Sequence, residues 1–276
     1  MFSLNCKGKL LVIDKPLVMG IINVTPDSFY AGSRQQADAS VLALATKMNN
    51  DGADIIDVGG QSTRPGSKRI SVKEELQRVL PAIETILKHF PKTIISVDTY
   101  QSEVAKEAIK SGAAIINDIS AGNMDNNMIH AVAKLEVPYI CMHMKGTPKD
   151  MQENASYENI TKEVLDFFIQ KTAECKQAGI NDIVIDPGFG FGKGIADNFT
   201  LLKALSIFTM LEKPIMAGLS RKSTIYKTLN TTAENALNGT TVLNTLALQN
   251  GANILRVHDV KEAKEAVKLY EFYSQA

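Results

Sequence analysis

Three apolar runs of this chain end in side chains that accept hydrogen bonds, namely Asp98, Asn117 and Asp186. A buried polar group without a partner is costly, so these acceptors need N–H donors in any dry pocket that they line. A flat heterocycle with ring N–H groups and an exocyclic amine supplies such donors. The three residues therefore predict a pocket for a ring of this kind.

A second set of polar residues suits an anion. Lys222 and Ser223 stand at the start of a helical stretch, whose first backbone N–H groups attract negative charge. Arg256 and His258 follow the last apolar run. Asn23 ends the first run and offers a neutral oxygen, which suits Mg2+ that keeps its waters and binds mainly through ligand phosphates. This set predicts a phosphate-bearing ligand and is compatible with Mg2+.

The segment 186–193, DPGFGFGK, is rich in glycine but matches neither common nucleotide pattern. A phosphate-binding loop requires glycine where Pro187 stands, and the spacing of the dinucleotide pattern fails as well. The glycines permit positive φ and a close approach of backbone to a flat ligand. Phe189, Phe191 and Met142 are candidates for the apolar faces of the pocket.

Eight short apolar runs position these residues. Four follow a glycine and four begin with proline, and the two kinds alternate along the chain. The runs are continuously apolar, as expected of parallel strands covered on both faces. Their ends average one βα unit per roughly 33 residues, which fits a (β/α)8 barrel. The runs end at residues 23, 57, 98, 117, 143, 186, 220 and 256.

Amphipathic helices are expected between the runs, and the glycines are expected to cap them. Ser71 with Glu74, and Asp259 with Glu262, have the spacing of capping boxes that open helices. Two apolar helix faces follow from the spacing: Val41, Leu44, Ala45 and Met48 in one, and Ile160, Val164, Phe167, Phe168, Cys175 and Ala178 in the other.

We therefore predict one α/β domain, residues 1–276, folded as a (β/α)8 TIM barrel. Residues 1–15 are expected to form a short β-hairpin at the bottom of the barrel, turning at Lys7 and Gly8. A doubly wound sheet is the alternative, but it seldom needs eight regular units. The loops 25–33 and 59–66 are rich in Gly, Ser and Pro, and we interpret them as lids at the mouth.

Composition excludes several classes of protein. The net charge is zero and no basic tract occurs, which disfavours nucleic acid as a partner. No apolar run is long enough for a membrane span, and no secretory signal is recognised. Cys6, Cys141 and Cys175 lie far apart, which fits reduced thiols in the cytoplasm.

His143 has no second ligand at metal spacing and is interpreted as structural.

Taken in order, these motifs resemble the dihydropteroate synthase family over nearly the whole chain. Each motif alone is modest, but the ordered set is specific. It comprises GIINVTPDSF from residue 20, DVGGQSTRPG from 57, SVDT from 96, IND from 116, MHM from 142, DPGFGFGK from 186, SRKS from 220 and RVHD from 256. The chain departs from the family at Tyr30–Ser33 and Gln61, both in the predicted lids.

The resemblance implies that 4-aminobenzoate displaces pyrophosphate from 6-hydroxymethyl-7,8-dihydropterin diphosphate, giving 7,8-dihydropteroate for folate biosynthesis. It also implies Mg2+ as cofactor and a homodimer packed through late helices, around residues 233–249. By position, Asp98, Asn117 and Asp186 would hold the pterin, with Lys222 near its ring and Met142 and Phe191 as apolar walls.

The remaining roles follow from the same resemblance. Arg256, His258 and Asn23 would hold the diphosphate, Asn23 through Mg2+, with Thr63 and Arg64 close by. Lys222 and Ser223 would flank the carboxylate of 4-aminobenzoate. The catalytic set implied is Asp98, Asp186, Lys222 and Arg256.

Three alternatives are weighed against this interpretation. A pterin-binding methyltransferase module would have no use for the STRPG and SRKS motifs. A barrel aldolase would use Lys222 as a Schiff base, but that lysine stands between Arg221 and Ser223, a setting for an anion. A paralogue that only binds pterin should have lost Asp98, Lys222 or Arg256.

Overall fold

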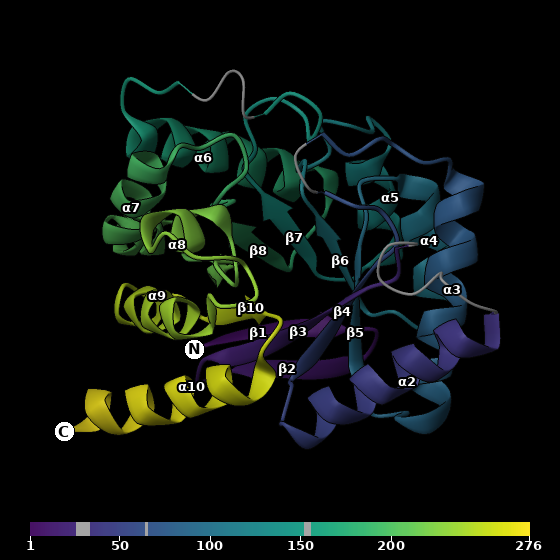
Figure 1. Cartoon of the computed structure of the whole chain (residues 1–276). Helices are drawn as coiled ribbons and strands as arrows, with labels where there is room; N and C mark the ends of the chain where they lie inside the picture. The colour runs from purple at the N-terminus through teal and green to yellow at the C-terminus, as the bar shows by residue number, and fades with distance from the viewer. Residues whose placement is uncertain (26–33, 64–65, 152–155) are drawn as a thin grey trace.

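The computed structural model describes residues 1–25, 34–63, 66–151 and 156–276. Eight parallel strands form a barrel surrounded by helices, which confirms the predicted fold (Figure 1). The order is β8-β7-β6-β5-β4-β3-β10-β9, and a bridge between Ile185 and Ile215 joins β8 to the last strand. The strands are β3 (Leu17–Asn23), β4 (Ile55–Gly59), β5 (Ile94–Asp98), β6 (Ile115–Asp118), β7 (Tyr139–Met142), β8 (Ile183–Asp186), β9 (Met216–Ala217) and β10 (Ile254–Val257).

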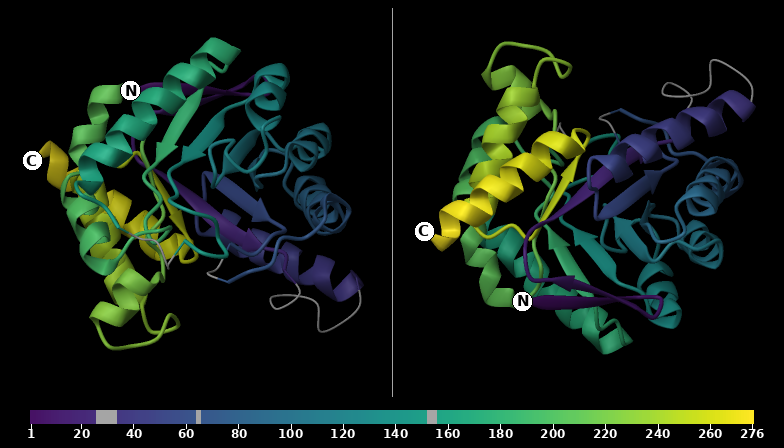
Figure 2. Two further views of the ribbon diagram at one scale, coloured as in Figure 1. Left: turned by 90° about the horizontal axis from the view of Figure 1, so that it is seen from above. Right: turned by 90° about the horizontal axis from the view of Figure 1, so that it is seen from below.

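The N-terminal hairpin is also confirmed (Figure 2). Strands β1 (Phe2–Cys6) and β2 (Lys9–Ile13) pair antiparallel around a turn at Lys7 and Gly8. Their buried side chains join a core cluster with Met19, Ile55 and Ile254, each near the start of a barrel strand. The hairpin therefore closes the bottom of the barrel, opposite the predicted site.

Helices cover the outside of the barrel (Figure 2). Val41, Ala45 and Met48 are buried as predicted, and so are Ile160, Val164, Phe168 and Cys175, whereas Ala178 is exposed at the end of its helix. No helix of the described residues is long and apolar enough to cross a membrane. The helices are α2 (Arg34–Asn50), α3 (Val72–His89), α4 (Ser102–Lys110), α5 (Met128–Leu135), α6 (Ile160–Ala178), α7 (Ile195–Lys203), the 3-10 helix η1 (Leu205–Leu211), α8 (Ser223–Thr228), α9 (Leu237–Gln249) and α10 (Val260–Gln275).

The glycines that precede four strands end helices in the left-handed conformation. Gly52, Gly112, Gly179 and Gly251 have φ of +89°, +112°, +97° and +97°. An L side chain disfavours this conformation, so glycine stops each helix and turns the chain towards its next strand. The predicted caps are confirmed.

The two predicted capping boxes have different outcomes. Ser71 accepts a hydrogen bond from the backbone N–H of Glu74 at 3.2 Å, so it caps α3. Asp259 makes no side-chain cap on α10. Its two carboxylate oxygens instead accept from Arg221, at 2.8 Å each. The prediction at Asp259 is wrong because a distant guanidinium is the stronger partner.

Candidate active site

The guanidinium of Arg256 joins two carboxylates at the mouth of the barrel. From β10, its Nε donates to Asp57 on β4 at 2.7 Å and its Nη2 donates to Asp98 on β5 at 2.6 Å. A long side chain on β10 therefore reaches over β3 and brings the predicted anion-binding set into contact with two acids.

Asp57 is a site residue that sequence reasoning recognised only as a strand end. It is fully buried, and its Oδ2 also accepts from Nδ2 of Asn117 at 3.0 Å. This bond turns the amide so that Oδ1 of Asn117 is left for a ligand. Oδ1 of Asp57 is buried without a partner among the described residues. The predicted run ended at Asp57, whereas β4 continues to Gly59, and the available signal was a carboxylate within an otherwise apolar strand.

The side chains of Asp186 and Lys222 both lie close to Gly218, which has no side chain to separate them. A Cβ at Gly218 would lie 3.7 Å from Nζ of Lys222 and 3.9 Å from Oδ2 of Asp186. Nζ of Lys222 donates to the carbonyl of Phe189 at 2.5 Å and lies 4.7 Å from the ring centroid of Phe191. The loop after β8 therefore holds this lysine beside the acidic residue.

Burial shifts the pKa values of several of these groups towards neutral pH. Burial raises the pKa of Asp98 to about 7, while Arg256 opposes the shift. Burial also raises the pKa of Asp186, against the attraction of Lys222. Burial lowers the pKa of Lys222 to about 8, against the attraction of Asp186. The mouth therefore holds acids and a base whose charge depends on what binds there.

An apolar cluster lies beside these charges. Met142 is buried against Tyr100 and Ile119, and the ring of Phe191 packs on this cluster while remaining partly exposed. Phe189 differs, because its side chain is fully buried in the main core. The interpretation of the Phe189 ring as a pocket wall is therefore wrong, and only its carbonyl contacts Lys222.

Oδ1 of Asn23 faces the same region of the mouth as Asp98. A Cβ on Gly59 would lie 3.6 Å from Oδ1 of Asn23 and 3.6 Å from Oδ2 of Asp98, so both oxygens face one region. Oδ2 of Asp98 is already bonded to Arg256. No cluster of three or more metal-binding side chains occurs in the described residues. The residues fit an ion that draws most of its ligands from phosphate and water.

Known proteins are similar to this chain over nearly its whole length. The pattern of the pterin-binding enzyme family matches residues 19–258. Dihydropteroate synthase of Escherichia coli is 45% identical over 271 residues, which covers 98% of this chain and 95% of the relative. The chain belongs to the dihydropteroate synthase family.

Solved structures agree with this membership. Dihydropteroate synthase of Xanthomonas albilineans with 4-aminobenzoic acid has a TM-score of 0.93 at 39% identity, covering 99% of this chain and 98% of that one. The Yersinia pestis enzyme in a sulfonamide drug complex has a TM-score of 0.93 at 40% identity, with both chains fully covered. The Xanthomonas albilineans enzyme with 7,8-dihydropteroate has a TM-score of 0.89 at 36% identity, with both chains fully covered.

The other predicted residues of this dihydropteroate synthase fold lie around the same mouth. His258 follows β10, and its Nδ1 lies 3.0 Å from Oγ of Ser220. That hydroxyl also accepts from the backbone N–H of His258 at 3.2 Å, and a hydroxyl that donates to Nδ1 would leave Nε2–H for a ligand. Ser223 is the first residue of α8, and Thr63 follows β4. Arg64 and residues 26–33 of the first predicted lid lie outside the described residues.

The structural interpretation of His143 is supported by its surroundings. Its ring is buried edge-on against Phe167, with centroids 4.9 Å apart, and its Nδ1 lies 2.9 Å from Nζ of Lys193. Burial, with Lys193 and Lys145 nearby, lowers the pKa of His143 to about 2. The imidazole is therefore neutral and serves as a hydrogen-bond acceptor for the lysine.

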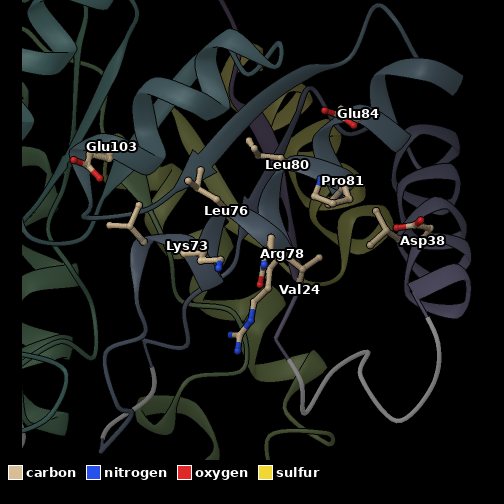
Figure 3. Close-up of a pocket in the computed structure, with 13 residues that line it drawn as sticks. Val24, Asp38, Lys73, Leu76, Arg78, Leu80, Pro81, Glu84 and Glu103 are labelled. Atoms are coloured by element: carbon tan, nitrogen blue, oxygen red, sulfur yellow. The ribbon is translucent and has the colours of Figure 1, made fainter.

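A separate groove of about 820 Å3 lies on the outer helices (Figure 3). Val24, Asp38, Leu76, Pro81 and Glu103 are among the residues that line it. None of the predicted site residues that the structure describes lines this groove. The candidate active site of this dihydropteroate synthase relative is accordingly the barrel mouth, where the carboxylates, the amide and the cations converge.

Proposed function

We propose that this chain catalyses the dihydropteroate synthase reaction, joining 4-aminobenzoate to the methylene carbon of 6-hydroxymethyl-7,8-dihydropterin diphosphate with release of pyrophosphate. The observation that carries the proposal is the bond network that unites Asp57, Asp98, Asn117 and Arg256 at the mouth. It presents acceptors for a pterin directly beside a guanidinium for a diphosphate.

The acceptors suit the edge of a pterin ring. Among the described residues, Oδ1 of Asn117 has no hydrogen-bond donor, and Oδ1 of Asp186 accepts from the backbone N–H of Gly188 at 2.8 Å. Asp98 adds a buried carboxylate. Ring N–H groups and the exocyclic amine would satisfy these oxygens, and Phe191 and Met142 would cover the faces of the ring.

The cations suit the leaving group. A guanidinium has five N–H donors, and the bonds to Asp57 and Asp98 leave others for phosphate oxygens. Nε2 of His258 adds a further donor. Mg2+, held by Asn23 and the diphosphate, would supply further charge neutralisation. Thr63 and Arg64 are proposed to lie near the same group.

The chemistry follows from this separation of charge. The bond between the pterin methylene carbon and the diphosphate oxygen breaks, and both electrons leave with pyrophosphate. The ionised carboxylates of Asp98 and Asp186 stabilise the positive charge that develops on the pterin. The arylamine nitrogen then forms the new C–N bond and loses a proton to solvent. Lys222 and Ser223 hold the carboxylate of 4-aminobenzoate.

The test is an assay of pyrophosphate release from the pterin diphosphate, with and without 4-aminobenzoate, followed by mass detection of dihydropteroate. We expect release that depends on both substrates and on Mg2+. Release that is indifferent to 4-aminobenzoate, or a product without the aryl group, would contradict the proposal. A chelator should slow turnover and leave the binding of a plain pterin unchanged.

Assembly and location are proposed as well. Val242 and Leu246 on α9, and Leu269 and Phe272 on α10, are apolar and exposed on helices that lie side by side (Figure 1). Such a surface suits a homodimer, which sedimentation of the wild-type chain and of a Val242→Asp variant would test. The three cysteines are free and buried, which is consistent with a cytoplasmic protein.

A further inference from the structure

Lys193 is a buried cation that the proposed reaction does not use. Its residue is only 3% exposed, at the end of the glycine-rich segment after β8. Its Nζ lies 2.9 Å from Nδ1 of His143 and 3.2 Å from the carbonyl oxygen of the same residue. It also lies 3.0 Å from the carbonyl oxygen of Gly188 and 3.1 Å from that of Phe191. Four acceptors therefore surround one ammonium group.

The ammonium ties two loops together. The carbonyls of Gly188 and Phe191 belong to the loop after β8, whereas His143 is the first residue after the neighbouring strand β7. The ammonium shares three N–H donors among four acceptors. It thereby holds together carbonyl dipoles that would repel one another without it. Burial lowers the pKa of Lys193 to about 7, with Asp186 opposing the shift. The cation is therefore sensitive to any loss of these partners.

The glycines allow this closeness. Gly188 has φ of +69°, and a Cβ there would lie 2.0 Å from the carbonyl oxygen of His143. Gly192 has φ of +62°, and a Cβ there would lie 2.3 Å from the carbonyl oxygen of Lys145. The sequence predicted that these glycines approach a ligand. At these two positions they approach the backbone of the loop after β7.

The segment so held is the one that positions Lys222. It supplies the carbonyl of Phe189, which accepts from Nζ of Lys222, and the ring of Phe191, which lies under that ammonium. Phe191 contacts both lysines, because its carbonyl accepts from Lys193 and its ring lies against the ammonium of Lys222. A path of direct contacts therefore runs from Lys193 through Phe191 to Lys222.

We propose that Lys193 is a positioning residue for the reaction, acting through the loop after β8 to hold the ammonium of Lys222 in place. This inference rests on the proposed function, in which Lys222 contacts the substrates. The competing possibility is a contribution to fold stability alone. The two differ in whether the effects of changing Lys193 and Lys222 are independent of each other.

The experiment is a double-mutant cycle on kcat/KM with Lys193→Met, Lys222→Met and the double variant. Methionine keeps the length and apolar bulk of the lysine stem and removes the charge. We expect Lys193→Met to lower kcat/KM by roughly ten- to a hundredfold, as for a displaced substrate contact, and to raise the same KM as Lys222→Met. The double variant should lose no more than about twofold beyond Lys222→Met, because the two changes remove one interaction.

Losses that multiply in the double variant would overturn the proposal, as would an unchanged kcat/KM in Lys193→Met. Lys203→Met is the matched control, because Lys203 is exposed at the end of α7, and it should retain wild-type kinetics. An inactive wild type would contradict the proposed function rather than this inference. An active wild type with independent effects would contradict the inference alone.

A second measurement covers the case in which Lys193→Met does not fold. Nitrogen-detected NMR of the wild-type chain should show one lysine ammonium protected from exchange with water, and Lys193→Arg, which keeps the charge, should remove that signal. The planar guanidinium cannot reproduce the contacts of the ammonium, so this variant should also raise the KM that Lys222→Met raises. A wild type without a protected ammonium, or Lys193→Arg with wild-type KM, would contradict the proposal.

Discussion

Two groups of cations lie at the barrel mouth, and they donate hydrogen bonds to different kinds of acceptor. Arg256 donates to the carboxylates of Asp57 and Asp98, which raises its pKa further. Lys193 and Lys222 donate to backbone carbonyls of the loop after β8, and burial lowers their pKa values to about 7 and about 8. Full negative charges compensate burial, whereas carbonyl dipoles do so only in part. The guanidinium of Arg256 therefore keeps its charge, whereas the two lysines titrate near neutral pH.

The largest effect is expected from Asp98→Asn, which breaks the acidic side of the comparison. The amide keeps the shape but removes the charge that stabilises the pterin cation and binds Arg256. We expect kcat/KM to fall by roughly a hundred- to a thousandfold with the fold preserved, measured by steady-state kinetics and circular dichroism. Wild-type rates in this variant would contradict the role assigned to Asp98.

Arg256→Ala should have the next largest effect, on binding and on stability together. Its removal leaves the buried carboxylate of Asp57 without its cation, at a cost of about 3 kcal/mol in the free energy of unfolding. Calorimetry should show a much greater loss of affinity for the pterin diphosphate than for a plain pterin. Equal losses for both ligands would contradict the placement of Arg256 beside the diphosphate.

The pH dependence tests the second region. The pKa of Lys222 is lowered to about 8, so its ammonium is present below that pH and is lost as the pH rises through it. We expect the KM for 4-aminobenzoate to rise above pH 8 in the wild-type chain. Lys222→Arg keeps its charge over the whole range, so its KM should stay flat with pH, at whatever level the altered geometry sets. A wild-type profile without this rise would show that Lys222 does not bind through its charge.

The smallest effect is expected from Arg221→Lys, outside both groups. Arg221 has φ of +55° and binds Asp259 through two hydrogen bonds, and it also donates to the carbonyls of Ala233 and Glu234. A lysine cannot make the paired bonds, so thermal unfolding should show a loss of about 1 kcal/mol. A changed KM with an unchanged free energy of unfolding would place Arg221 in the site itself.

Local structure was predictable because local chemistry decides it. The glycine caps at residues 52, 112, 179 and 251 follow from the freedom of glycine at positive φ, which is independent of the rest of the chain. Continuous apolar runs between those caps predicted parallel strands, and their regular spacing predicted the barrel. The polar residues at the strand ends then had to meet at one mouth.

Contacts between distant residues were not predictable in the same way. Arg256 binds Asp57 from 199 residues away, and nothing near either residue indicates the other. Asp259 has the spacing of a helix cap, yet Arg221 takes both of its oxygens. Each partner was chosen by strand order and side-chain reach, which the closed barrel sets.

The sequence by itself determined the family, the barrel and the positions of the acids and cations at its strand ends, because periodicity and turn chemistry act over a few residues. Only the tertiary structure decided which of those groups pair, that Asp57 joins them, and that carbonyls of the loop that contacts Lys222 enclose Lys193. Hydrogen bonds and ion pairs depend on distances of about 3 Å. Such distances between remote residues exist only once the whole barrel has closed.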